Sequence, residues 1–149
     1  MGQVQTGVPQ MKKAFRADHA VPISKAIRAG DFVFTSAYGP WLFDPRDLTF
    51  DAEGNMLDDG TGKKDMPFEE QVHKTFGFIK EALAMADCTL DDVVNCECWI
   101  TDSRDFVAFN KIYQTYFTKD PPVRSIFPMR FNFTCKVEMK VVAYKPLKG

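Results

Sequence analysis

The chain has few of the residues on which metal sites and nucleic-acid surfaces depend. Its two histidines lie far apart, and its four cysteines include no C-x-x-C pair, so no familiar zinc-binding spacing is present. The 19 lysines and arginines are balanced by 20 aspartates and glutamates, which leaves no field that would attract nucleic acid or an anionic membrane. We therefore expect no metal site, no nucleic-acid partner and no membrane partner.

Long apolar runs are also missing. No segment has the length and hydrophobicity of a transmembrane helix or of the core of a signal sequence. Cys96 and Cys98 share one side of an expected strand, where buried reduced thiols are favoured over a redox pair. From these observations we expect a cytoplasmic protein with free thiols.

The composition is that of one globular domain. The chain has 149 residues, of which 45% are hydrophobic and 26% charged, and a core of this size gains stability from a partner subunit. Residues 1–19 are polar and aperiodic, and are predicted to form a partly ordered arm. Residues 44–65 are rich in turn formers and are predicted to form an extended loop insertion, with a candidate strand pair about Gly54-Asn55. The prediction is a single domain over residues 1–149.

Two amphipathic helices are predicted. The first runs from Pro67 to Ala86, since proline and two glutamates suit its first turn. The second follows Asp102, a good capping residue, and must end before Pro121. Each carries one apolar stripe at spacings of three and four. The stripes are Val72, Phe76, Ile79, Leu83 and Ala86, and Phe106, Phe109, Tyr113, Tyr116 and Phe117.

The remaining strand formers predict a mixed sheet. A hairpin turns at Gly30-Asp31, and further strands are expected over residues 93–101, 123–131 and 136–144. The strand between the two helices requires a crossover, so one pairing should be parallel. The fold class is therefore α+β, a two-layer domain with both helices on one face of the sheet. The other face should expose Phe32 or Phe34, Trp99 and Ile126, which predicts a homo-oligomer.

Two charged residues near the C-terminal end suggest a site for a small acid. Arg124 follows the rigid Pro121-Pro122 turn and offers a fork to a carboxylate, while Glu138 on the next strand could orient water. Two simpler interpretations are open, namely a surface ion pair for Arg124 and a cross-strand charge cluster for Glu138. Arg130 or Lys140 could hold a second carboxylate of a larger substrate.

Six segments stand out in chain order: Pro22-Ile23-Ser24-Lys25-Ala26, Phe32-Val33-Phe34-Thr35-Ser36, Leu90-Asp91-Asp92-Val93-Val94, Asp105-Phe106 with Asn110 and Tyr113, Pro122-Val123-Arg124-Ser125, and Val137-Glu138 followed by Ala143. Together they resemble the YjgF/RidA family of reactive intermediate deaminases, also called endoribonuclease L-PSP. The likeness extends from Pro22 to Tyr144, nearly the whole domain.

The resemblance implies a chorismate-mutase-like fold assembled as a homotrimer, with clefts between subunits. It implies hydrolysis of 2-imino or 2-enamino acids to keto acids and ammonia, with no cofactor. The substrate-binding arginine falls on Arg124, the water-positioning glutamate on Glu138 and the helix asparagine on Asn110. Backbone groups around Ile126 would bind the substrate nitrogen, and Ser36 and Tyr38, which follow the second strand, are candidates to line the cleft.

Three departures from the family pattern bear on the substrate. Ile23 stands where the family usually has tyrosine, Ala37 replaces a glycine, and Ile126 replaces a cysteine. The missing tyrosine hydroxyl and the insertion at 44–65 favour a substrate other than, or larger than, aminoacrylate, such as an aminomuconate-like acid. The alternatives are a non-catalytic trimer that binds small carboxylates and, ranked last, the ribonuclease of the older family label.

Overall fold

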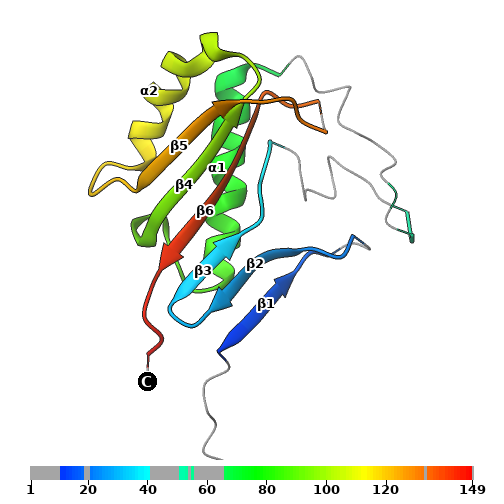
Figure 1. Cartoon of the computed structure of the whole chain (residues 1–149), viewed down its shortest axis with the longest axis vertical. Helices are drawn as coiled ribbons and strands as arrows, with labels where there is room; N and C mark the ends of the chain where they lie inside the picture. The colour runs from blue at the N-terminus through cyan, green and yellow to red at the C-terminus, as the bar shows by residue number, and fades with distance from the viewer. Residues whose placement is uncertain are drawn as a thin grey trace, which may run out of the picture.

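A computed structural model describes residues 11–18, 21–40, 51–53, 55, 66–132 and 134–148. Six strands form a sheet in the order β1-β2-β3-β6-β4-β5 (Figure 1). Only the β4–β5 pair is parallel, and the other neighbours within this sheet are antiparallel. The strands are β1 Lys12–Arg16, β2 Ser24–Ala29, β3 Phe32–Thr35, β4 Val93–Ile100, β5 Val123–Pro128 and β6 Val137–Tyr144.

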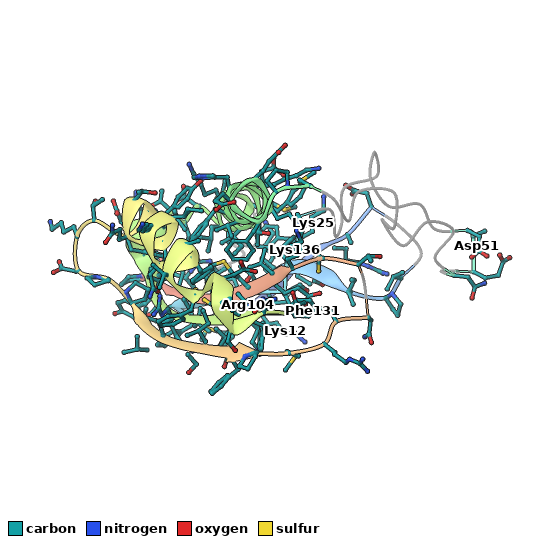
Figure 2. All side chains as sticks on the ribbon, turned by 90° about the horizontal axis from the view of Figure 1, so that it is seen from above. Lys12, Lys25, Asp51, Arg104, Phe131 and Lys136 are labelled. Atoms are coloured by element: carbon teal, nitrogen blue, oxygen red, sulfur yellow. The ribbon has the colours of Figure 1, made fainter. Side chains whose placement is uncertain are left out.

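Both helices, α1 Phe68–Met85 and α2 Phe106–Tyr116, cover the same face of the sheet (Figure 2). The predicted two-layer α+β domain with a mixed sheet is therefore confirmed. Alternate residues of β6, including Val137 and Met139, are fully buried beneath the helices, as strand periodicity requires. Neither helix in the described ranges is long and apolar enough to span a membrane.

The two helices pack on one another through aromatic side chains from their predicted stripes. The ring of Phe76 on α1 stacks on that of Tyr116 on α2, with centroids 3.9 Å apart, and meets Phe117 edge to face. All five stripe residues of α1 are buried. On α2 the prediction is wrong for Phe106, which lies in the first turn and is 40% exposed.

Helix α2 is the crossover of a β4-α2-β5 unit, which explains the parallel pairing. Asp102 accepts a hydrogen bond from the backbone N–H of Arg104 and so caps the turn of 3-10 helix, Ser103–Asp105, that opens α2. The expected cap is confirmed. The Arg104 side chain also pairs with the Asp102 carboxylate and lowers the pKa of Asp102 to about 2.

The N-terminal strand β1 was not predicted. It pairs with β2, the first strand of the expected hairpin, whose turn places Gly30 at φ +58°. The sequence Lys12–Arg16 has no clean alternation because β1 is an edge strand with little burial on either side. Part of the predicted arm is thus sheet, while residues 1–10 and 19, and nearly all of the 44–65 insertion, lie outside the described residues.

The start of β4 departs from simple alternation, because a register irregularity between Val93 and Asn95 buries Val93 and exposes Val94. The expectation that Ile126 lies on the open face is wrong. Ile126 pairs with Cys98 and packs toward the core, so it belongs to the helix face. The expectation that Phe32 or Phe34 lies on the open face is confirmed for both residues, and Trp99 joins them because it alternates with buried Cys98.

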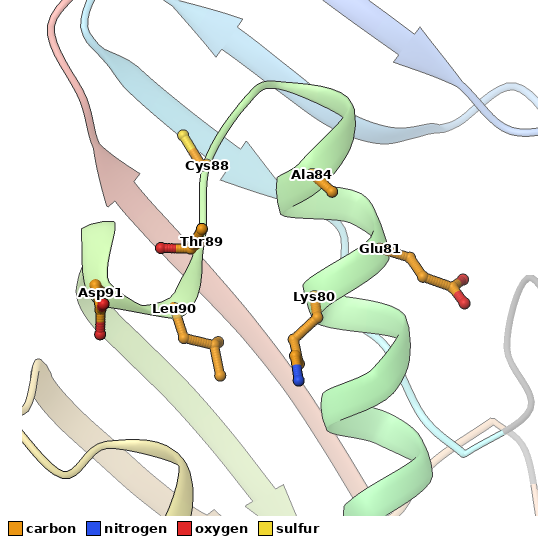
Figure 3. Close-up of a pocket in the computed structure, with 7 residues that line it drawn as sticks. All are labelled: Lys80, Glu81, Ala84, Cys88, Thr89, Leu90 and Asp91. Atoms are coloured by element: carbon orange, nitrogen blue, oxygen red, sulfur yellow. The ribbon is translucent and has the colours of Figure 1, made fainter.

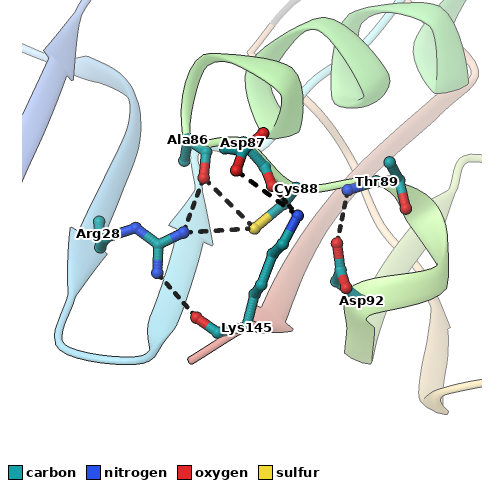
Figure 4. A network of polar contacts seen from close by, with 7 residues as sticks. All are labelled: Arg28, Ala86, Asp87, Cys88, Thr89, Asp92 and Lys145. Atoms are coloured by element: carbon teal, nitrogen blue, oxygen red, sulfur yellow. Dashed lines mark hydrogen bonds and ion pairs between the residues drawn. The ribbon is translucent and has the colours of Figure 1, made fainter. Parts of the chain in front are cut away.

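The buried side chain of Arg28 forms hydrogen bonds to three separate parts of the fold (Figure 4). The Arg28 guanidinium donates to the backbone carbonyl of Ala86 at 2.7 Å, just past the end of α1, and to those of Lys145 at 3.0 Å and Gly30 at 3.3 Å. Carbonyls at a helix C-terminus lack intrahelical partners, so Arg28 supplies the missing donor. It also places positive charge at the negative end of the helix dipole.

Replacing Arg28 by methionine should lower the free energy of unfolding by about 2 to 4 kcal/mol, because several buried carbonyls lose their donor. Urea denaturation at fixed protein concentration would measure this. The control is Lys119→Met, at an exposed position, which should leave the transition midpoint unchanged. Equal midpoints for Arg28→Met and the parent protein would show that the network contributes nothing.

Candidate functional site

Arg124 lies on the edge strand β5 and points to the helix face, since it pairs with the buried Cys96. Its Nη1 donates to Oδ1 of Asn110 on α2 at 2.8 Å. Its guanidinium carbon lies 4.7 Å from the ring centroid of Tyr113 and about 6 Å from those of Phe106 and Phe109. Helix and strand therefore hold the guanidinium in one orientation through a hydrogen bond and cation–π contacts.

The charge of Arg124 is not neutralised within the described part of the chain, where it forms no ion pair. It is nevertheless only partly exposed. Arginine offers two parallel N–H groups to a carboxylate, and Asn110 occupies only Nη1. Such a cation, held in place by neutral partners, is suited to bind an anion from outside the chain.

Tyr113 was expected only to fill the core, but it also forms the nearest wall of this arginine site. Its hydroxyl is buried without a hydrogen-bond partner in the described part of the chain. Burial raises the pKa of Tyr113 above its ordinary value, so the hydroxyl stays protonated. The sequence signal was present in the spacing of Tyr113 three residues after Asn110, which places both on one face of α2.

Glu138 lies on β6 and faces the open side of the sheet, because it pairs with Trp99 and alternates with the buried Met139. It is half-buried, and burial raises the pKa of its carboxyl above the ordinary value. The thiol of Cys135 lies 3.8 Å from its Oε1. A carboxylate in such a setting is a candidate general base.

The cross-strand charge cluster considered for Glu138 involves other residues. Lys140 Nζ pairs with Glu97 on β4 at 3.2 Å, and no described cation forms an ion pair with Glu138. Lys140 is therefore engaged in an ion pair with Glu97. Arg130, by contrast, lines a hollow of about 600 Å³ together with Lys136 and Cys135.

Arg124 and Glu138 lie on opposite faces of the sheet. Cys96 of β4 is paired with Arg124 on β5 and with Val141 on β6, so these three side chains point to the helix face. Trp99 of β4 is paired with Glu138, so these two side chains point to the open face. Strand β4 separates their strands. A single copy of the chain does not bring the two groups into one pocket.

Of the other predicted site residues, Ser36 and Tyr38 follow β3 and form hydrogen bonds to the backbone of β2. Ser36 donates its hydroxyl to the carbonyl of Ser24 at 2.6 Å. Tyr38 is buried on the helix side, stacks on Phe78 and donates its hydroxyl to the carbonyl of Lys25. That Ser36 and Tyr38 line a cleft between subunits stays a prediction. Ile126 follows Arg124 by two residues on the same face. Among the predicted site residues, Asn110 contacts the guanidinium.

A further hollow, of about 500 Å³, lies between the C-terminal half of α1 and the turn of 3-10 helix at Leu90–Asp92 (Figure 3). Lys80 and Leu90 point into it, whereas Glu81 points away. It includes none of the predicted site residues. Within the described ranges, no group of three or more histidine, cysteine, aspartate or glutamate side chains is arranged to hold a metal ion.

The fold is that of a small two-layer α+β protein, with Arg124 on β5 and Glu138 on β6. The family model described as endoribonuclease L-PSP matches residues 12–145, which is most of the chain. The chain therefore belongs to this family, also called YjgF/RidA. The family resemblance seen in the sequence is confirmed.

Curated relatives cover most of both chains. A RutC family protein of Saccharolobus solfataricus is 30% identical over 125 residues, covering 83% of this chain and 87% of the relative. A RutC family protein of Synechocystis is 31% identical over 127 residues, covering 84% and 87%.

Solved structures support the same fold. The yeast Mmf1 crystal structure matches with a TM-score of 0.66 at 23% identity, covering 85% of this chain and 90% of that one. A YjgF/YER057c/UK114 family member from Mycobacterium tuberculosis matches with a TM-score of 0.68 at 20% identity, covering 89% and 98%. At these identities the likeness concerns the fold alone.

Replacing Glu138 by glutamine should stabilise the protein at neutral pH. Because burial raises the folded-state pKa of Glu138, its contribution to stability is fully present below the unfolded pKa and is lost as pH rises through the folded pKa. Glutamine mimics the protonated form at every pH. The stability advantage of Glu138→Gln in urea denaturation should therefore be present at pH 7 and shrink toward pH 4. A variant less stable than the parent at pH 7 would contradict this assignment.

Proposed function

We propose that this protein hydrolyses 2-imino or 2-enamino acids to the corresponding keto acids and ammonia. Arg124 binds the substrate carboxylate and fixes its orientation. Glu138 holds a water molecule, takes one proton from it as its oxygen attacks the imine carbon, and returns a proton to the departing nitrogen. The C–N bond breaks as the carbonyl forms, so one imine and one water give one keto acid and one ammonia.

The observation that carries this proposal is the pair of partly buried, unneutralised charges. Arg124 is positioned by Asn110 and aromatic rings instead of by a carboxylate, and Glu138 has no cation partner within the described ranges. Structural charges in proteins usually have a partner of opposite sign when they are removed from water. An acid that carries a reactive imine offers the anion that Arg124 lacks.

The proposed site forms between copies of the chain. Because the two groups face opposite sides of one sheet, Arg124 of one protomer must meet Glu138 of another. The open face provides a surface for such assembly, with exposed Phe32, Phe34 and Tyr144 along neighbouring strands β3 and β6. A closed homotrimer, as the family resemblance implies, repeats this contact three times.

The substrate is proposed to be larger than aminoacrylate. Ile23 is partly buried against the core and brings no hydroxyl to the cleft, in contrast to the usual family tyrosine. Arg130 and Lys136 line one hollow near Cys135, and their positive charges suit a second acidic group on the substrate. An aminomuconate-like dicarboxylic acid fits both observations.

Replacing Arg124 by glutamine should lower kcat/KM by about 10- to 100-fold, the cost of losing a charge-assisted bidentate pair. The assay generates imino acids with an amino-acid oxidase and follows the extra ammonia released by the added protein. Lys119→Gln serves as the control and should match the parent. Undiminished turnover by Arg124→Gln would refute the assigned role.

Mixing two impaired variants tests whether the site is shared. Arg124→Gln and Glu138→Gln, unfolded together and refolded as mixed trimers, should regain about a quarter of the parental activity by random assortment. Each restored site takes arginine from one protomer and glutamate from its neighbour. If both groups acted within one chain, no mixed assembly would be active.

A carboxylate-binding trimer without catalysis is the alternative function. It is favoured by Ile23 and Ala37, which stand where the family usually has a tyrosine and a glycine. Calorimetry that shows keto-acid binding dependent on Arg124 but not on Glu138, without turnover, would support it. The ribonuclease named in the family description is tested by RNA cleavage with nuclease-free protein, and the balanced charge of the chain gives it little support.

A further inference from the structure

Cys135 is the one thiol in the described structure that touches the proposed catalytic carboxylate. Its Sγ lies 3.8 Å from Oε1 of Glu138 and is placed to donate its proton to that oxygen. The other described cysteines, Cys88, Cys96 and Cys98, contact Arg28 or one another instead. Nothing in the family pattern quoted above uses a cysteine at this position.

The surrounding backbone holds the thiol and the carboxylate together. The N–H of Lys136, the residue after Cys135, donates to the side chain of Gln71, a fully buried residue of α1. The backbone of Tyr38 exchanges two hydrogen bonds with Met139, the residue after Glu138. The segment from Cys135 to Met139 is therefore anchored on both sides of the contact.

The backbone of Gly39 lies next to the contact between Cys135 and Glu138. A Cβ atom at Gly39 would lie 3.4 Å from Cys135 Sγ and 3.6 Å from Glu138 Cγ, so the backbone packs directly against both side chains. Both distances are ordinary van der Waals contacts. Oε1 of Glu138 is the side-chain acceptor within reach of the thiol.

We infer that Cys135 is a positioning residue that orients the Glu138 carboxylate by donating a hydrogen bond from a neutral thiol, an assignment that rests on the proposed function for its catalytic consequence. The thiol fixes one oxygen of the carboxylate and leaves the other free to hold water. No bond to sulfur forms, and the thiol proton stays on Cys135 throughout.

The charge state of both groups agrees with this geometry. Burial and the nearby Glu138 raise the pKa of Cys135 to about 12, so the thiol remains protonated and able to donate. Burial raises the pKa of Glu138, and the hydrogen bond from Cys135 opposes this by favouring the ionised form. Lys136, just before β6, and Lys140 on β6 flank Glu138 in the sequence. Lys140 is paired with Glu97 of β4, and Trp99 and Gly39 bring no charge.

Cys135→Ala should lower kcat by about threefold to tenfold with KM little changed, the rate equivalent of one lost hydrogen bond. The acid limb of the pH–rate profile should move to higher pH, because Glu138 loses a donor that favours its ionised form. Cys135→Ser keeps a donor and should restore both properties. If packing alone mattered, serine and alanine would be equally impaired and the profile would not move.

A direct titration separates this inference from the proposed function. The Glu138 side-chain carboxyl is followed by carbon NMR in the parent, Cys135→Ala and the control Cys88→Ala, in which an equally buried thiol away from Glu138 is removed. We expect the titration midpoint to rise only in Cys135→Ala. An unchanged midpoint would overturn the inference even if the parent is an active deaminase, whereas a raised midpoint in a protein without turnover would refute only the proposed function.

Discussion

Packing of both helices against one face of the sheet is the constraint on which the rest of the molecule depends. It commits alternate residues of β4 and β6 to the core, among them the fully buried Cys96, Cys98 and Met139. The residues between them are then committed to the open face, where Glu138 lies half-buried. Strand alternation thus decides the side on which each charged group can act.

The same constraint leaves apolar surface on the open face of the sheet. Apolar side chains on the open face, including Phe32 and Phe34, have no cover within the described chain. Association of copies would remove this surface from water and bring an arginine and a glutamate from different protomers together. Stability and the proposed catalysis would then depend on the same contact between copies. This gives a physical reason why a domain of this size retains Arg124 and Glu138 without partners of opposite charge.

Much of the fold could be predicted because its signals are local. The α1 stripe, the Asp102 cap and the alternation of β6 each arise from neighbours within a few residues, and each was confirmed. The failures occurred where burial depends on distant segments. Strand β1 exists through its pairing with β2, and Ile126 takes its direction from β4.

For the candidate site, the sequence by itself determined the identities of Arg124, Asn110 and Glu138 and their assignment to β5, α2 and β6, because family likeness and periodicity are properties of the linear chain. Only the tertiary structure decided that Asn110 meets Arg124, that Glu138 faces the other side, and that Cys135 contacts it. These contacts depend on strand order, register and the turn before β6, which are set by interactions between segments far apart in the sequence.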